Sequence, residues 1–124
     1  MDTNPTEENL EITSEETGHG VYRIRVRGNL ELATSEILRT HLAKVLRAGH
    51  KHLMMDLNEV GYLDSSGLAA LLGALRRVRE NQGSLRLVCN VRPVLRVLGL
   101  TGLDRLLAIY PNEESALRDL PKTD

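Results

Sequence analysis

The chain of 124 residues has the length of one ordinary domain, with 41% hydrophobic and 27% charged residues and a formal net charge of −1. This composition is typical of a globule with an aliphatic core and excludes an intrinsically disordered chain. Because the chain has no Trp, no Phe and 3 Tyr, stacking of aromatic side chains on bases is nearly excluded, and we expect no nucleic-acid partner.

The termini and the cysteine content indicate the compartment. Residues 1–9 are polar and acidic, and we expect them to form a flexible tail. They have neither the basic nor the apolar region of a signal peptide, and no apolar run approaches the roughly 18 residues of a membrane helix. The single cysteine, Cys89, cannot form an internal disulfide, which favours a reducing compartment. We therefore expect a cytoplasmic protein without membrane insertion.

Two strands are predicted first along the chain. Leu10 and Ile12 alternate with polar neighbours, and residues 21–27 place Val, Ile and Val on one side and three Arg on the other. Gly18-His19-Gly20 between them predicts the turn of a hairpin. We expect the second strand to end at Gly28-Asn29.

Helices and strands then alternate to the end of the chain. The predicted elements are a helix from Thr34 or Ser35 to about Ala48, a doubly buried strand over 53–57, a leucine-striped helix after Gly67, a strand over 85–89, a helix with Pro93 in its first turn, a strand over 106–110, and a helix through Leu120. The order ββαβαβαβα predicts a single α/β domain. Its sheet is mixed but mostly parallel, with four to five strands, an antiparallel N-terminal edge hairpin and about four packed helices.

Charge is distributed unevenly along this predicted fold. Residues 1–20 carry six acids and no Lys or Arg, whereas residues 76–96 carry six Arg and one Glu. The basic segment predicts either a solvated arginine-rich face or attraction to an acidic partner or a phosphate. The sequence leaves both interpretations open.

The segment Asp64-Ser65-Ser66-Gly67 lies where a predicted strand ends and a helix begins. Ligands collect at the carboxyl ends of strands in α/β sheets, and a helix N-terminus favours negative charge. Asp and Ser are also the ordinary residues that cap a helix. Position alone therefore predicts either a plain cap or a site that exposes a hydroxyl.

An enzymatic function is not supported by the motifs. A hydrolase elbow requires Gly-x-Ser-x-Gly, and Leu63 stands where the first glycine would be. Neither a phosphate-binding loop nor a dinucleotide-binding glycine motif is present. The spacing of His50 and His52 is poor for metal ligation. We expect no catalysis, no cofactor and no metal.

The helix after the serines has a second face of small side chains beside its leucine stripe. Gly73 disfavours a helix interior by about 1 kcal/mol relative to Ala, which favours a contact at this face over a purely solvated one. The residues of this strip are Ser66, Ala69, Ala70, Gly73, Arg76 and Arg77.

The segment from Leu53 to Leu72, which contains Asp64-Ser65-Ser66-Gly67-Leu68, resembles the signature of bacterial STAS domains and in particular of anti-sigma factor antagonists. The strand after Gly83 and the turn Leu98-Gly99-Leu100-Thr101-Gly102-Leu103 fit the same family. Gly28-Asn29-Leu30-Glu31 lies where the family usually has Gly-Glu-Leu-Asp. The resemblance covers roughly residues 10–118. It implies a STAS domain over residues 10–120, followed by a C-terminal tail over 121–124.

The resemblance implies a protein that switches partners. In that family the unphosphorylated form binds an anti-sigma factor and thereby releases a sigma factor. The anti-sigma factor is also a serine kinase that phosphorylates the serine after the Asp, and a serine phosphatase resets the switch. By position the target here is Ser65, surrounded by Asp64 to orient the site, Ser66 as a second hydroxyl, and Gly67 to let the partner approach.

The remaining predicted site residues form the partner interface; two come from the resemblance and four from the small-residue face of the helix. They are Asn29, Glu31, Ala69, Ala70, Gly73 and Arg77. Asn29 and Glu31 replace the usual Glu and Asp, which affects the identity of the partner more than the fold. We expect a monomer when the protein is free. The alternatives are a STAS domain that serves, without phosphorylation, as an assembly subunit of a transport ATPase or signalling complex, and a small enzyme or nucleotide-binding domain.

Overall fold

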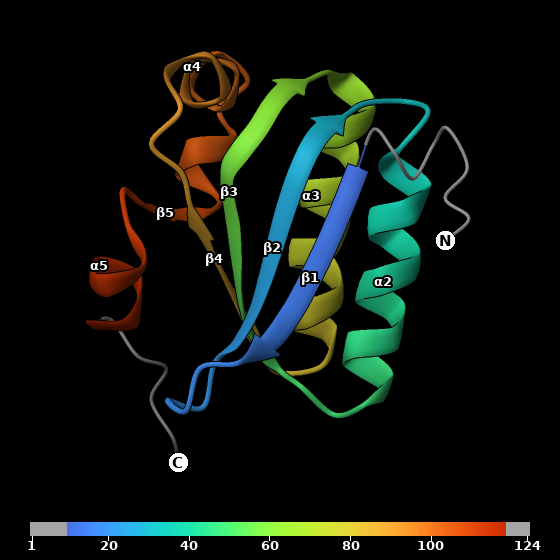
Figure 1. Ribbon diagram of the computed structural model, residues 1–124, viewed down its shortest axis with the longest axis vertical. Coiled ribbons are helices and arrows are strands. Elements are labelled where there is room, and N and C mark those ends of the chain that lie inside the picture. The colour runs from blue at the N-terminus through green and yellow to red at the C-terminus, as the bar shows by residue number, and fades with distance from the viewer. Residues whose placement is uncertain (1–9, 119–124) are drawn as a thin grey trace.

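A five-stranded mixed sheet forms the centre of the molecule in the computed structural model, which describes residues 10–118 (Figure 1). The strand order follows the chain, β1 is antiparallel to β2, and all other neighbours are parallel. This arrangement confirms the predicted hairpin edge and parallel sheet. The strands are β1 (Leu10–Glu16), β2 (Tyr22–Leu30), β3 (His52–Leu63), β4 (Ser84–Val88) and β5 (Ala108–Tyr110).

The helices alternate with the parallel strands as predicted. Within the described residues they are α2 (Ser35–Arg47), α3 (Ser65–Glu80), α4 (Arg92–Leu100), the short 3-10 helix η1 (Leu103–Arg105) and α5 (Glu113–Arg118). The predicted final helix is described as far as Arg118, the last described residue, and Leu120 lies outside the described part. The predicted tails over 1–9 and 121–124 also lie outside the described residues.

The turn of the hairpin depends on its two glycines. Gly18 and Gly20 have φ of 85° and 77°. This left-handed backbone region is open to glycine at little cost. The hairpin then aligns Leu10 with Gly28 and Glu16 with Tyr22.

Three predicted strand boundaries are wrong. β2 continues past Gly28-Asn29 to Leu30, and β3 continues from the predicted end at 57 to Leu63. The two strands stay paired over this stretch because their register shifts twice, between Arg25 and Arg27 and between Gly28 and Asn29. β5 begins only at Ala108, because the backbone N–H groups of residues 106 and 107 donate to the Leu103 carbonyl in the turn after η1.

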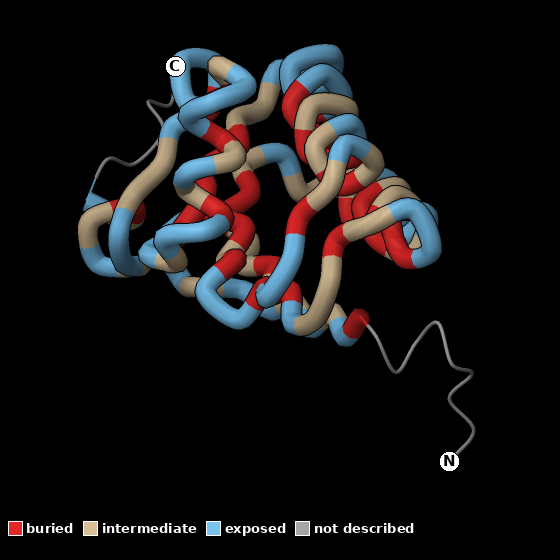
Figure 2. Tube along the Cα trace, turned by 90° about the horizontal axis from the view of Figure 1, so that it is seen from above, coloured by how far each residue is buried: buried red, intermediate tan, exposed pale blue. Residues whose placement is uncertain are grey.

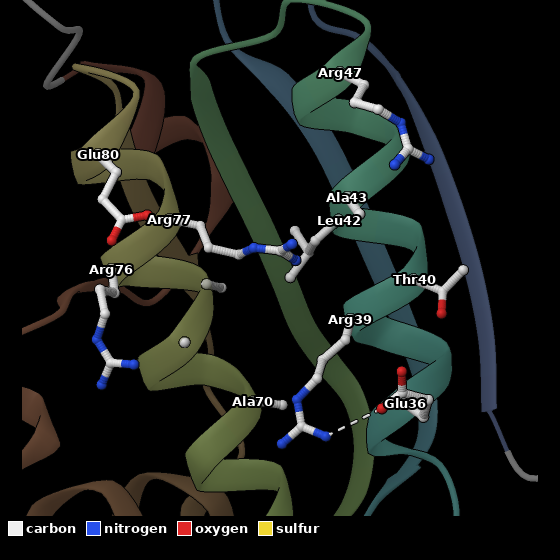
Figure 3. A pocket seen from close by; sticks show the side chains of 12 residues that line it. Glu36, Arg39, Thr40, Leu42, Ala43, Arg47, Ala70, Arg76, Arg77 and Glu80 are labelled. Carbon is white, nitrogen blue, oxygen red and sulfur yellow. Dashed lines mark hydrogen bonds and ion pairs between the residues drawn. The ribbon is translucent and has the colours of Figure 1, made fainter.

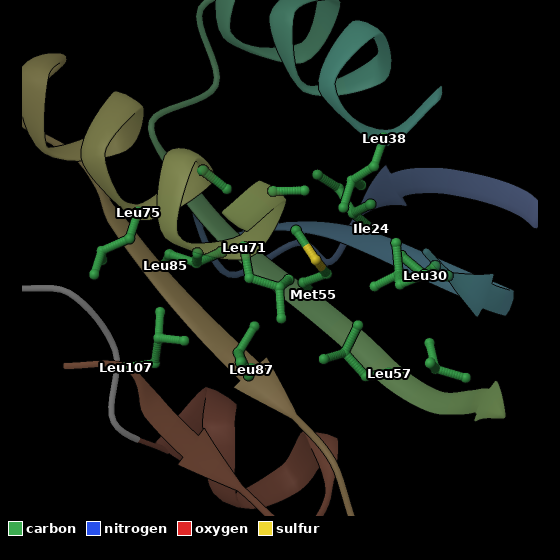
Figure 4. Packing of buried hydrophobic residues seen from close by; sticks show 14 of the residues in the cluster. Ile24, Leu30, Leu38, Met55, Leu57, Leu71, Leu75, Leu85, Leu87 and Leu107 are labelled. Carbon is green, nitrogen blue, oxygen red and sulfur yellow. The ribbon is translucent and has the colours of Figure 1, made fainter. Parts of the chain in front are cut away.

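The main core lies between the sheet and helices α2, α3 and α4. Figure 4 shows Leu38 of α2 and Leu71 of α3 facing Ile24 and Met55 of the sheet, all completely buried. Figure 2 shows the buried residues gathered between the elements and the exposed ones on the outward turns. The aliphatic core and the double burial predicted for β3 are thereby confirmed, since Met54 and Met55 are both fully buried although they point to opposite faces.

The opposite face of the sheet is covered over a smaller area, by α5. Val21, Met54, Val88 and Ala116 form a second, small core there. Beside it, Arg23 contacts both Glu15 (2.7 Å) and Glu113, and thereby ties α5 to the hairpin. The larger part of the apolar burial thus lies on the side of α2 and α3.

Candidate functional site at the start of α3

The four residues of the sequence motif lie at the junction between β3 and α3. β3 ends at Leu63, Asp64 is the N-cap, and α3 begins at Ser65. Leu63 pairs with Leu30, the last residue of β2, so the carboxyl ends of two neighbouring strands meet beside the start of the helix. The predicted position of the motif at the carboxyl edge of the sheet is confirmed.

Asp64 holds the start of α3 against the preceding loop. Its Oδ1 atom accepts hydrogen bonds from the backbone N–H groups of Ser66 (2.9 Å) and Gly67 (3.0 Å). Its Oδ2 atom accepts from the N–H of Leu32 (3.3 Å), and its own N–H donates to the Leu30 carbonyl (3.1 Å). One carboxylate therefore caps the helix and fixes the β2–α2 loop beside it.

The Ser65 side chain is exposed at the first residue of α3. None of the groups in residues 10–118 forms a hydrogen bond with its hydroxyl. Ser66 is partly buried. The oxygen of Ser65 is thus accessible at a helix N-terminus, where the aligned peptide dipoles favour a negative group.

Gly67 is buried, and its place in the structure corrects the expectation that it leaves room for a partner. A Cβ atom at this position would lie 2.4 Å from the carbonyl oxygen of Leu30 and 2.7 Å from Cδ1 of Leu63. The missing side chain therefore allows the first turn of α3 to pack on the end of β2. Gly67 supports the site from within the fold.

Asn29 and Glu31 lie at the same end of the molecule as Asp64. Asn29 belongs to β2, and its Oδ1 atom lies close to Gly61 of β3. Glu31 follows the strand, and its N–H donates to Oγ1 of the fully buried Thr34 (3.1 Å). The hydroxyl of Thr34 in turn donates to the Asn29 carbonyl. Thr34 thus stabilises the loop through these bonds, and its side chain forms no cap hydrogen bond with α2.

Two exposed apolar side chains flank the site and were not predicted. Leu32 is 78% exposed in the loop that Asp64 fixes, and Tyr62 is 52% exposed two positions before Asp64. Large apolar side chains exposed beside a polar group are typical of a surface that contacts another protein. No local sequence pattern indicates the exposure of Leu32, because that exposure depends on how the β2–α2 loop is held.

The residues of the predicted small-residue strip on α3 differ in their exposure to solvent. Ala69 and Arg77 are exposed and Gly73 is half-buried, but Ala70 is only 1% exposed. Ala70 therefore cannot belong to an outer strip with Ala69. It lies in a groove between α2 and α3, together with Gly73 and Arg77 (Figure 3).

The described residues also bear on metal binding, membrane insertion and thiol reactivity. Residues 10–118 contain no group of three or more His, Cys, Asp or Glu side chains placed to hold a metal ion. Within the same residues, no helix combines the length and apolarity needed to cross a membrane. Cys89 is buried at 2% exposure, and burial raises the pKa of its thiol. It therefore belongs to the core rather than to a reactive site.

The mixed sheet and the motif at the strand–helix junction are those expected of a STAS domain, and comparison with known proteins agrees with this class. The model of the STAS domain family matches residues 13–116. The chain belongs to the STAS domain family.

Similar proteins give a narrower picture. The chain is 34% identical over 114 residues to the anti-sigma F factor antagonist of Paenibacillus polymyxa, covering 90% of this chain and 96% of that protein. A crystal structure of an anti-sigma factor antagonist from Mycobacterium paratuberculosis superposes with a TM-score of 0.80 at 26% identity, covering 95% of this chain and 100% of the other. The phosphorylated form of the Bacillus cell fate determinant SpoIIAA shares the fold, with a TM-score of 0.66 at 21% identity over 86% of this chain and 97% of that one.

Proposed function

We propose that this protein is an anti-sigma factor antagonist whose unphosphorylated form binds an anti-sigma factor and so releases a sigma factor. Phosphorylation of Ser65 by the same anti-sigma factor ends the binding, and a serine phosphatase restores it. The observation that carries the proposal is the exposed Ser65 hydroxyl, without a hydrogen-bond partner in residues 10–118, at the start of α3. The names of the similar proteins from Paenibacillus and Mycobacterium support the partner class.

A phosphate at Ser65 is compatible with the fold. It adds a charge of about −1.5 to −2. At the N-terminus of α3 this charge is stabilised by roughly 0.3–1 kcal/mol. Because the side chain already lies in solvent, the added group displaces nothing in the core. The modified domain therefore keeps its structure.

The same phosphate disfavours a complex. If a partner carboxylate or nucleotide phosphate lies about 6 Å away, an effective dielectric constant near 20 gives a repulsion on the order of 5 kcal/mol before screening. Half of that value weakens binding by roughly 50-fold. Modification thus acts on association and leaves folding unchanged, as a partner switch requires.

The surface offered to the partner includes more than Ser65. Leu32 and Tyr62 supply exposed apolar area near the serine. Asn29 near the end of β2 and Glu31 directly after β2 lie at the same edge. Apolar side chains surrounded by polar ones are typical of the centre and rim of a protein interface. These residues, with Ala69, Gly73 and Arg77 along α3, form the proposed interface.

Phosphorylation by candidate kinases tests the proposal. The full chain is incubated with ATP and each serine-kinase anti-sigma factor of the source organism, and peptides are analysed by mass spectrometry. We expect one phosphate, on Ser65, which Ser65→Ala abolishes and Ser66→Ala retains. Phosphate on Ser66 instead contradicts the assignment. Tight binding without any phosphate transfer would instead indicate an assembly subunit.

A further inference from the structure

A groove of about 560 Å³ runs between α2 and α3 on the outer side of the helical layer (Figure 3). Ala70 and Ala74 form its floor and are 1% and 2% exposed, so they are already covered by their neighbours in the domain. Gly73 is half-buried, and a Cβ atom added there would meet nothing within 4 Å. The backbone of another element can therefore come close to α3 at Gly73.

The rim of the groove is basic. Arg39 and Arg77 extend over it from the two facing helices, Arg39 toward Ala70 and Arg77 toward Leu42 (Figure 3). Arg47 and Arg76 also line it. Since the only acids in the lining are Glu36 and Glu80, four Arg and two Glu give the rim a formal charge of +2.

Most of this positive charge is not balanced inside the domain. Arg39 contacts Glu36 at 3.4 Å, and both side chains are exposed. Within residues 10–118, Arg47, Arg76 and Arg77 form no ion pair with any carboxylate. The alternative interpretation, an arginine face that only contacts water, does not explain why these side chains surround a groove with a floor of Ala and Gly.

The geometry points to an acidic α-helix of the partner protein as the occupant of this groove. Two helices form its walls, and they offer no free strand edge with which an extended peptide could pair. A helix satisfies its own backbone hydrogen bonds and therefore suits a groove that offers none from a strand edge. The α2 wall from Glu36 to Arg47 is about 16 Å long at 1.5 Å per residue, which accommodates about three helical turns.

This inference rests on the proposed function for the identity of the partner. Gly73 lies eight residues after Ser65 on α3, about 12 Å along the helix axis. A partner that covers Ser65 can thus also place a helix in the groove. The carboxylates of that helix would pair with Arg76 and Arg77, and its small or apolar side chains would face Gly73.

The first test uses a charge reversal and binding calorimetry. We expect R76E/R77E to weaken binding of the unphosphorylated chain to its anti-sigma factor by about tenfold or more, since two attractive pairs become repulsive. The control is K44E/K51E, which reverses two exposed lysines outside the groove lining and should change affinity less than about twofold. Equal losses in both variants, or no loss in R76E/R77E, overturn the inference.

A steric variant tests the floor independently of charge. Gly73→Trp should block the anti-sigma factor, while the melting temperature, followed by circular dichroism, stays close to that of the unmodified chain. Undiminished affinity of a folded G73W protein overturns the inference. If R76E/R77E and G73W bind normally while Ser65 is still phosphorylated, the proposed function stands and the groove has no part in it.

A model helix allows a test that does not depend on the anti-sigma factor. An alanine-rich peptide of about 15 residues with three glutamates is near the length at which such helices persist. Added to the full chain, it should shift the NMR signals of Gly73 and Ala74, and R76E/R77E should abolish the shifts. A peptide with lysines in place of the glutamates should give none. NMR shifts at other residues, or no shifts at all, overturn the inference. A dimer of this chain that dissociates in R76E/R77E, as measured in the ultracentrifuge, overturns it as well.

Discussion

Gly67 and Gly73 both lie in α3, but one is tightly packed and the other has open space around it. Substituting each by alanine therefore provides a controlled comparison. A Cβ atom at position 67 would meet the Leu30 carbonyl at 2.4 Å, whereas one at 73 would meet nothing within 4 Å. We expect Gly67→Ala to destabilise the domain by about 1–3 kcal/mol, because β2 and α3 must move apart. Gly73→Ala should stabilise it by up to about 1 kcal/mol, because alanine loses less backbone entropy in a helix. Urea unfolding followed by circular dichroism measures both, and equal effects would contradict this packing.

Asp64 is predicted to stabilise the site through its side-chain oxygens. Asp64→Ala leaves the N–H groups of Ser66, Gly67 and Leu32 without their acceptor, and we expect a loss of about 1 kcal/mol in the free energy of unfolding. Asp64→Asn keeps an oxygen and should lose less. Hydrogen exchange at the three amides provides a direct measurement. Unchanged protection in Asp64→Ala would show that the carboxylate does not hold the loop.

The position of residues 64–67 in the fold is predictable from the sequence, but the packing around them is not. Residues 64–67 were placed at a strand–helix junction because the capping pattern and the leucine stripe are local signals. The packing of Gly67 was missed because it depends on β2 reaching Leu30, which no local pattern indicates. The burial of Ala70 was missed for a similar reason, since the sequence does not say which side of α3 faces α2.

The attachment of α5 to the sheet should depend on pH. Nε of Arg23 donates to Oε1 of Glu113 at 2.8 Å. This hydrogen bond is the main cause that lowers the pKa of Glu113 below its ordinary value of 4.5. The stabilisation is therefore fully present above about pH 4.5 and is lost as the pH falls through the lower folded-state pKa.

The matching variant is Glu113→Gln. It should lower stability at pH 7 by about 1 kcal/mol, a modest value because the pair is partly exposed. It should also reduce the additional loss of stability that the unmodified domain shows in acid. Thermal melts between about pH 7 and pH 3 measure this difference. Parallel pH curves for the two proteins would mean that Glu113 does not contribute to acid sensitivity.

Secondary structure is predicted correctly where the pattern within the element itself specifies it. It is predicted wrongly where pairing with another strand determines the bounds of the element. The alternating residues of β2 and the stripe of α3 specify their own structure. Asn58, Glu59 and Gly61 have low strand propensity, yet they belong to β3. Glu59 pairs with Arg27 of β2, and Asn58 and Gly61 are skipped at the two register shifts. An isolated sequence window cannot contain that information, because the partner strand lies about 30 residues earlier in the chain.

The arrangement of the whole molecule followed from the order of its elements. Strands that alternate with helices favour parallel pairing with right-handed crossovers, whereas the short turn of the first hairpin favours an antiparallel pair. The fold was therefore predictable from the sequence. The groove between α2 and α3 was not, because it depends on how two helices lie side by side on the sheet, and the arginines of its rim come from distant parts of the chain.

A final prediction distinguishes an effect on folding from an effect on binding to the anti-sigma factor. Ser65→Asp places a negative charge on an exposed side chain at the start of α3, so the melting temperature should change little. Against a negative group of the partner about 6 Å away, this single charge gives roughly half the repulsion of a phosphate, enough to weaken binding by about tenfold or more. Ser65→Asn has nearly the same size without the charge and should bind as the unmodified chain does. Melts and calorimetry on the same samples provide both measurements. Loss of binding in both variants would indicate a steric cause, and an unfolded Ser65→Asp protein would mean that residue 65 belongs to the fold and not to a switch.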